Sequence, residues 1–279
     1  MALDDLPPIA EPMTPGAERF SREAIKRGQA ALGGVLMSYG EHPLQSLVIF
    51  PAKRPVGPAL FFYHGGNWTN GSKDWFSFLA PALNARGITF VTIGYRHAPA
   101  DMFPHGFEDC LYGFDVAVRS IAGFGGDANR VFVGGHDAGA HYAALMTLKT
   151  GWRDALSLPN DVVKGCQPVS GFYDFAPNSG FSRRPVFLGV PEHKGERFAS
   201  AVRYAHPQSP PFMVSYGSDD LPHTRQQSMA LVRALKQQGV TAEELVLPGC
   251  DHYATGLALT EENGPWLAAA SWLMGINGG

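Results

Sequence analysis

An aspartate stands at the centre of a glycine-framed turn in this sequence. Residues 131–148 read as a strand, a sharp corner and a helix, and the corner is Gly135-His136-Asp137-Ala138-Gly139. This is the pattern of a nucleophile elbow, a strand-to-helix turn written G-x-S-x-G, with aspartate in place of serine. The central residue is strained and projects its side chain, and a Cβ at either flanking glycine would collide with the neighbouring strand and helix. Asp137 is therefore the first candidate catalytic residue.

Two further segments could complete a triad with the elbow residue. Gly217-Ser218-Asp219-Asp220 ends a predicted strand, and the spacing from Gly217 favours Asp220 over Asp219 as the acidic member. His252 follows the last predicted strand and closes the chain order nucleophile, acid, histidine. The acid would hold the imidazole in one tautomer and stabilise the imidazolium. We predict Asp137, Asp220 and His252 as the catalytic set.

Backbone donors for a developing oxyanion are expected in the loop His64-Gly65-Gly66-Asn67-Trp68, which follows a buried apolar strand. Glycines there let the backbone approach a substrate closely. We predict that the N–H groups of Gly65, Gly66 and Ala138 form this oxyanion hole.

Several side chains of the motif loops are expected to contact a substrate, although core packing is an equal alternative for the aromatic ones. For His136, packing or hydrogen bonding behind the site is the alternative. The predicted substrate contacts are His64, Asn67, Trp68, His136, Phe172 and Tyr253.

Strands and helices alternate along the chain, which predicts right-handed β-α-β crossovers and a mainly parallel central sheet flanked by helices, an α/β fold. The motif loops would then lie at the carboxyl ends of strands, where such sheets bind ligands. The predicted strands are 35–39, 47–50, 59–63, 88–95, 131–133, 162–169, 211–217 and 243–247. The predicted helices are 15–31, one that starts after Ser72 or Lys73, 108–122, 140–148, 228–238 and 265–274.

We expect one domain over residues 1–279, with residues 1–14 as a loose N-terminal arm. Residues 175–208 are the least periodic stretch and are expected to form a small lid or pocket wall.

Composition excludes several classes of function. A net charge of −3 and the lack of a basic stripe argue against a nucleic-acid partner. The start of the chain is acidic and proline-rich, unlike a signal peptide, and no apolar run approaches a membrane span. Three widely separated cysteines suit free thiols in a reducing compartment, so we expect a cytoplasmic protein. No histidine–carboxylate cluster has convincing metal spacing, and we predict no metal.

These motifs together resemble the α/β-hydrolases of the hormone-sensitive-lipase-like group, and within it the kynurenine formamidase (arylformamidase) branch. The resemblance covers roughly residues 45 to 275. The motifs that carry it are His64-Gly65-Gly66-x-Trp68, Tyr95-Arg96-x-Ala98-Pro99, Phe103-Pro104, Phe124-Gly125-Gly126-Asp127, Gly135-His136-x-Ala138-Gly139-x-His141, Gly151-Trp152, Ser170-Gly171-x-Tyr173-Asp174, Arg225-Gln226-Gln227-Ser228 and Asp251-His252-Tyr253.

The resemblance implies an α/β-hydrolase fold and hydrolysis of small carboxylic esters, aryl amides or aryl formamides without a cofactor. It also suggests a homodimer, for which the apolar C-terminal helix is suited. The sequence departs from the family at two positions. Asn67 stands where formamidases usually carry a tyrosine, and Asp137 stands where they carry the nucleophilic serine.

Four interpretations of Asp137 are open at this point. It could attack a saturated carbon of an epoxide or haloalkane, although Ala138 stands where dehalogenases usually carry a halide-binding tryptophan. It could attack an acyl group or activate water, while its charge would favour the imidazolium form of His252. The chain could be a catalytically disabled protein that keeps its pocket for binding. Asp137 could also be an engineered replacement of serine.

Overall fold

The structure is a computed structural model that describes residues 14–31, 33–181, 185–261 and 264–276 of the 279-residue chain. The predicted N-terminal arm, residues 1–14, lies outside these ranges except for Thr14. Thr14 caps the first helix, because its hydroxyl accepts a hydrogen bond from the N–H of Ala17.

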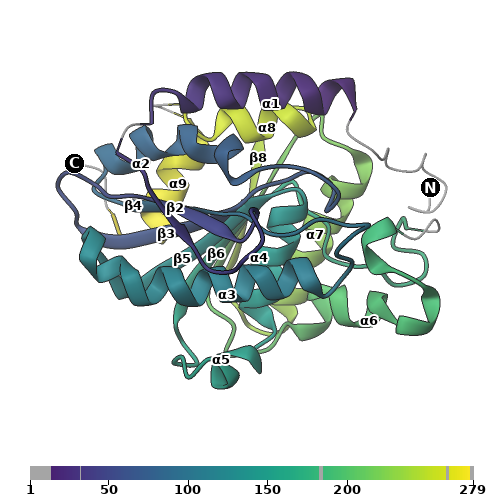
Figure 1. The fold of residues 1–279 in the computed structure, drawn as a ribbon. Helices are drawn as coiled ribbons and strands as arrows, with labels where there is room; N and C mark the ends of the chain where they lie inside the picture. The colour runs from purple at the N-terminus through teal and green to yellow at the C-terminus, as the bar shows by residue number, and fades with distance from the viewer. Residues whose placement is uncertain (1–13, 32, 182–184, 262–263, 277–279) are drawn as a thin grey trace.

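Eight strands of the described chain form one twisted sheet in the order β1-β2-β4-β3-β5-β6-β7-β8 (Figure 1). β2 pairs antiparallel with both of its neighbours, and the other pairs are parallel. The strands are β1 (Val35–Ser38), β2 (Ser46–Phe50), β3 (Gly57–Tyr63), β4 (Thr89–Ile93), β5 (Gly126–His136), β6 (Val163–Val169), β7 (Phe212–Gly217) and β8 (Ala242–Leu247).

Helices cover both faces of this sheet. The α-helices are α1 (Pro15–Gly28), α2 (Ala80–Ala85), α3 (His105–Ser120), α4 (Ala138–Leu148), α5 (Trp152–Ala155), α6 (Gly195–Ala199), α7 (Pro222–Gln237), α8 (His252–Ala258) and α9 (Pro265–Leu273). The described 3₁₀-helices are η2 (Lys73–Leu79), η3 (Ile121–Phe124), η4 (Val186–Leu188), η5 (Pro191–His193) and η6 (Ala201–Tyr204).

Alternate residues of each central strand enter opposite cores. On β3, Phe61 and Tyr63 pack with residues of α3, α4 and α7, whereas Leu60 and Phe62 pack with residues of α1, η2 and α9. Figure 1 shows α1 alongside α8 on one side of the sheet, with α3 on the other. A strand that is buried on both faces has to be apolar at every position, which explains the unbroken apolar run at residues 59–63.

The order of the strands fixes the place of the site. β3 lies between β4 and β5. The chain therefore passes from β3 to β4 on one side of β3, and it later forms β5 on the other side. Ligands of open α/β sheets bind at the carboxyl ends of the strands beside such a switch point. The loop after β3 begins with His64, and Asp137 follows β5 directly.

The predicted fold class is confirmed, with a mainly parallel sheet between helices. The helix predicted at 228–238 begins earlier, at Pro222, because proline is well suited to the first helical position. The predicted lid segment, residues 175–208, contains η4, η5, α6 and η6, and its role as a lid stays a prediction. Within the described residues, no helix has the length and apolar character that crossing a membrane requires.

Candidate active site

Asp137 lies at the sharp turn between β5 and α4. Its φ of 54° and ψ of −117° fall outside the regions that residues with side chains favour. A Cβ on Gly135 would lie 2.4 Å from the carbonyl group of Gly139, and a Cβ on Gly139 would lie 2.1 Å from the carbonyl oxygen of Tyr63. The steric need for both glycines, inferred from the elbow pattern, is therefore confirmed.

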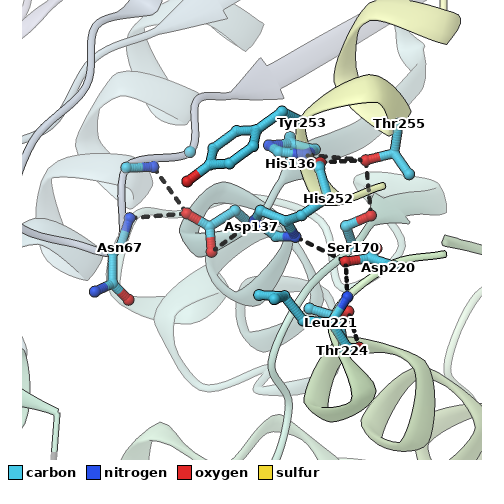
Figure 2. Close-up of polar contacts among 12 residues, drawn as sticks. Asn67, His136, Asp137, Ser170, Asp220, Leu221, Thr224, His252, Tyr253 and Thr255 are labelled. Carbon is cyan, nitrogen blue, oxygen red and sulfur yellow. Dashed lines mark hydrogen bonds and ion pairs between the residues drawn. The ribbon is translucent and has the colours of Figure 1, made fainter. Parts of the chain in front are cut away.

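The carboxylate of Asp137 accepts two backbone hydrogen bonds through a single oxygen. Oδ2 lies 2.8 Å from the N–H nitrogen of Gly66 and 2.8 Å from that of Asn67 (Figure 2). Two N–H groups that converge on one oxygen are the arrangement of an oxyanion hole. Asp137 thus occupies these two donors with its own side chain, and their use as an oxyanion hole stays a prediction.

One of the two donors to Asp137, Gly66, is also a predicted oxyanion donor, and the oxyanion roles of Gly65 and Gly66 stay predictions. Among the described hydrogen bonds of this oxygen, Gly66 and Asn67 are the donors and Gly65 is not. The loop turns through positive φ at Gly66 (126°) and Asn67 (51°), which directs their two N–H groups toward the elbow. Ala138, the first residue of α4, stays a predicted donor.

His252 lies between two carboxylates. Its Nδ1 is 3.0 Å from Oδ1 of Asp220, a hydrogen bond, and its Nε2 is 3.8 Å from Oδ1 of Asp137. Asp219, the other candidate acid, is exposed and accepts a hydrogen bond from the Ser218 hydroxyl. The structure thus brings together the three residues predicted as catalytic, and their catalytic roles stay predictions.

The two carboxylates raise the pKa of His252. Burial alone would lower the pKa of this imidazole, but the charge and hydrogen bond of Asp220, with the charge of Asp137, outweigh it. Burial would also raise the pKa of Asp220, yet the charge and hydrogen bond of His252 bring that pKa below its ordinary value. An imidazolium between two carboxylates is therefore favoured, and a protonated His252 cannot accept a proton from a nucleophile.

Buried polar groups hold the backbone of His252. Nε2 of His136 lies 2.9 Å from the carbonyl oxygen of His252, and Oγ1 of Thr255 lies 2.6 Å from the same oxygen. The Ser170 hydroxyl donates to Thr255 at 2.9 Å. Burial, reinforced by the nearby charge of His252, lowers the pKa of His136 to about 4, so this ring is neutral and its Nε2–H donates. The alternative given for His136, hydrogen bonding behind the site, agrees with these contacts.

Ring contacts hold both ends of the loop 64–68, in which the oxyanion donors are predicted. The His64 ring stacks on Tyr95 at 4.2 Å, and the Tyr95 hydroxyl donates to the carbonyl oxygen of His64 at 2.8 Å. The Trp68 indole stacks on Phe187 at 4.0 Å and donates to Nδ1 of His141 at 3.0 Å. These contacts hold a loop with two strained residues, Asn67 and Trp68, at positive φ.

The side chains predicted as substrate contacts divide by burial. His64, Trp68, His136 and Phe172 are buried by protein in this structure, while Asn67 and Tyr253 remain partly accessible. The ring of Phe172 is 6.5 Å from the ring of His252. The Tyr253 hydroxyl lies 2.7 Å from Oγ1 of Thr14, which ties this residue to the start of α1. The roles of these residues in substrate binding stay predictions.

Sequence reasoning missed two features of the site. Ser170 and Thr255 carry the hydroxyls behind His252, and only their places after β6 and within the segment after His252 could have signalled this. The stacking of Phe187 on Trp68 joins elements over a hundred residues apart and leaves no local signal. Within the described ranges, no group of three or more His, Cys, Asp or Glu side chains is arranged to hold a metal ion.

Comparisons with known proteins agree with this fold. Residues 60–255 match a family model described as the alpha/beta hydrolase fold, and the matched range includes all three predicted catalytic residues.

Curated relatives are 27% to 30% identical to this chain over the aligned residues. Isoprenylcysteine alpha-carbonyl methylesterase ICME of Arabidopsis thaliana is 29% identical over 235 residues, which are 77% of this chain and 55% of the relative. Kynurenine formamidase of Danio rerio is 28% identical over 231 residues, 81% of this chain and 76% of the relative. Esterase LipC of Mycobacterium tuberculosis is 30% identical over 235 residues, 77% and 58% of the two chains. The chain spans about half the length of the methylesterases that it matches.

Solved structures share the fold at lower identity. An esterase of Pyrobaculum calidifontis superposes with a TM-score of 0.73 at 19% identity and covers 93% of each chain. A bacterial heroin esterase gives a TM-score of 0.70 at 21% identity, covering 94% of this chain and 90% of the other.

Proposed function

This chain belongs to the alpha/beta hydrolase fold family, and on that premise we propose that it hydrolyses small carboxylic esters or aryl amides, formamides among them. The reaction would use the elbow residue Asp137, the His252–Asp220 pair and the backbone oxyanion hole. One observation carries this proposal. The elbow side chain lies against two convergent N–H groups on one side and against the His252 imidazole on the other.

Because Asp137 occupies the proposed oxyanion hole, it restricts the hydrolysis of esters and amides. The carbonyl oxygen of an ester becomes negative as it is attacked, and it needs the N–H groups of Gly66 and Asn67 at that moment. Oδ2 of Asp137 holds both donors in this structure, so the substrate oxygen must displace it. A serine at position 137 would leave the donors available and would place a hydroxyl beside His252. Asp137 therefore limits acyl hydrolysis on this scaffold.

The same occupancy favours a second candidate, hydrolysis at a saturated carbon such as that of an epoxide or haloalkane. Oδ1 of Asp137 would attack the carbon, the leaving group would depart with the bonding electron pair, and an ester on Asp137 would result. Its carbonyl oxygen, Oδ2, already lies in the hole. Water that gives its proton to neutral His252 would then attack Cγ, and the oxyanion would form where Gly66 and Asn67 donate. As the oxyanion collapses, the bond between Cγ and the alkyl-bearing oxygen would break, and the product alcohol would leave with the proton from His252.

The test compares the chain with its Asp137→Ser variant on a short-chain aryl ester and an aryl formamide. We expect the serine variant to be faster by about 10² to 10³, the effect of gaining an oxyanion hole and an activated nucleophile. Circular dichroism and unfolding curves of both proteins control for folding. If the aspartate form is the faster catalyst, Asp137 does not limit acyl hydrolysis on this scaffold. If both proteins are inert on carbonyl substrates, acyl hydrolysis is ruled out.

A labelling experiment separates the second candidate. The chain is incubated with an epoxide or a haloalkane in H₂¹⁸O, and the peptide that contains Asp137 is examined by mass spectrometry. Turnover through an ester on Asp137 places ¹⁸O in its carboxylate, because water attacks Cγ. Turnover with an unlabelled Asp137 contradicts the covalent route. Ligand-induced stabilisation without turnover of any of the four substrates would leave a binding protein as the conclusion.

A further inference from the structure

A cavity of about 570 Å³ lies in the segment predicted as a lid or pocket wall. Its apolar walls include Phe175, Phe181 and Leu188. None of the residues that line it belongs to the predicted catalytic set or to the predicted substrate contacts. A cavity of this size accommodates a small organic molecule, for which apolar walls with a few polar groups are typical.

The charged residues of the cavity are mostly cations. Lys194, Arg197 and Arg203 line it together with one acidic residue, Glu196. Within the described residues, these three cations take part in none of the ion pairs found. Among the described residues, the lining carries three cations and one anion, whereas the chain as a whole carries a net charge of −3. Their position fits a ligand with a negative group.

The apolar wall of this cavity lies between the cavity and the candidate active site. Phe181 lies in the wall, and its ring is 5.4 Å from that of Phe172. The Phe172 ring is in turn 6.5 Å from the ring of His252. Phe175, also in the wall, packs 5.7 Å from Trp68 of the oxyanion loop. The cavity is thus separated from the predicted catalytic histidine by a layer of aromatic rings.

From this placement we propose that the cavity binds the anionic end of an organic carboxylate with an aromatic or alkyl body. The apolar body lies against Phe175 and Phe181, and the carboxylate faces Lys194, Arg197 and Arg203. Exposed charge pairs are individually weak, so each cation contributes at most about fivefold to affinity.

Binding is tested without catalysis. Isothermal titration calorimetry compares 4-phenylbutyrate with its uncharged counterpart 4-phenylbutan-1-ol, on the full chain and on the Arg197→Gln and Arg203→Gln variants. We expect the anion to bind at least about fivefold more tightly than the alcohol, and each variant to lose about two- to fivefold. The matched control is Arg22→Gln on α1, a side chain that is 71% exposed and outside the cavity. Equal affinities for anion and alcohol, or equal losses in all three variants, overturn the proposal.

Discussion

At the elbow, one carboxylate faces two different environments. Oδ2 of Asp137 accepts backbone hydrogen bonds from Gly66 and Asn67, whereas Oδ1 faces His252 across 3.8 Å. The first environment ties the carboxylate to the position where a substrate oxyanion would form. The second adds a negative charge beside an imidazole that Asp220 already holds. The chemistry of this site therefore depends on how strongly Asp137 fixes the proton on His252.

This dependence gives a prediction about the pKa of His252. Replacing Asp137 by asparagine removes one of the carboxylates that raise this pKa but keeps the size of the side chain. We expect the pKa of His252 to fall, as measured by NMR titration of the imidazole. The control is Asp219→Asn, which removes an exposed charge that makes no contact with the ring among those described. An unchanged pKa in Asp137→Asn would show that Asp137 does not help to hold the proton.

A second prediction concerns stability and pH. The raised pKa of His252 contributes stability that is fully present below its unfolded value, about 6.5, and lost as pH rises through the folded pKa. The lowered pKa of Asp220 contributes stability that is present above about 3.9 and lost as pH falls through the folded pKa. Asp220→Asn should therefore destabilise the protein most between about pH 4 and 6.5. Urea unfolding at several pH values measures this, and Asp219→Asn should show no such window.

At the scale of elements, the turn between β5 and α4 depends on the absence of two side chains. A Cβ on Gly139 would lie 2.1 Å from the carbonyl oxygen of Tyr63, at the end of β3. Because this contact is with backbone, no rotamer change can relieve it. We predict that Gly139→Ala lowers the free energy of unfolding by about 3 kcal/mol or prevents folding. Gly123→Ala is the control, since a Cβ there meets nothing within 4 Å. Urea unfolding of both variants measures the difference, and equal stabilities would contradict the steric account.

The parts of the site that sequence could predict are those set by local pattern. The two glycines that flank Asp137 predicted the turn, and the position of Asp220 after the end of β7 predicted its role as the acid. The hydrogen bond from Asn67 to Asp137 could not be predicted, because the positive φ at Asn67 depends on the packing of the whole loop. The short helix α8 was not predicted, although Asp251 caps it by accepting two backbone hydrogen bonds.

At the scale of the whole molecule, the fold followed from unbroken apolar runs that alternate with helical periods. Such runs identify buried strands but do not give their order. The antiparallel pairing of β2 with β1 and β4 therefore appeared only in the structure. Contacts between distant segments, such as Trp68 with Phe187, depend on this order and could not be predicted from either segment alone.

The N-terminal helix gives the last prediction, because it connects the start of the chain to the back of the site. Phe20 on α1 is 5% exposed, and its ring stacks on His136 at 5.9 Å and lies 6.2 Å from the Tyr253 ring. We predict that Phe20→Ala lowers the free energy of unfolding by about 3 to 5 kcal/mol, the usual cost of emptying a buried aromatic site. Ile25→Ala on the same helix is the matched control, since Ile25 is 47% exposed and should cost little. If urea unfolding finds similar small decreases in the free energy of unfolding for both variants, the packing of α1 against the site contributes little to stability.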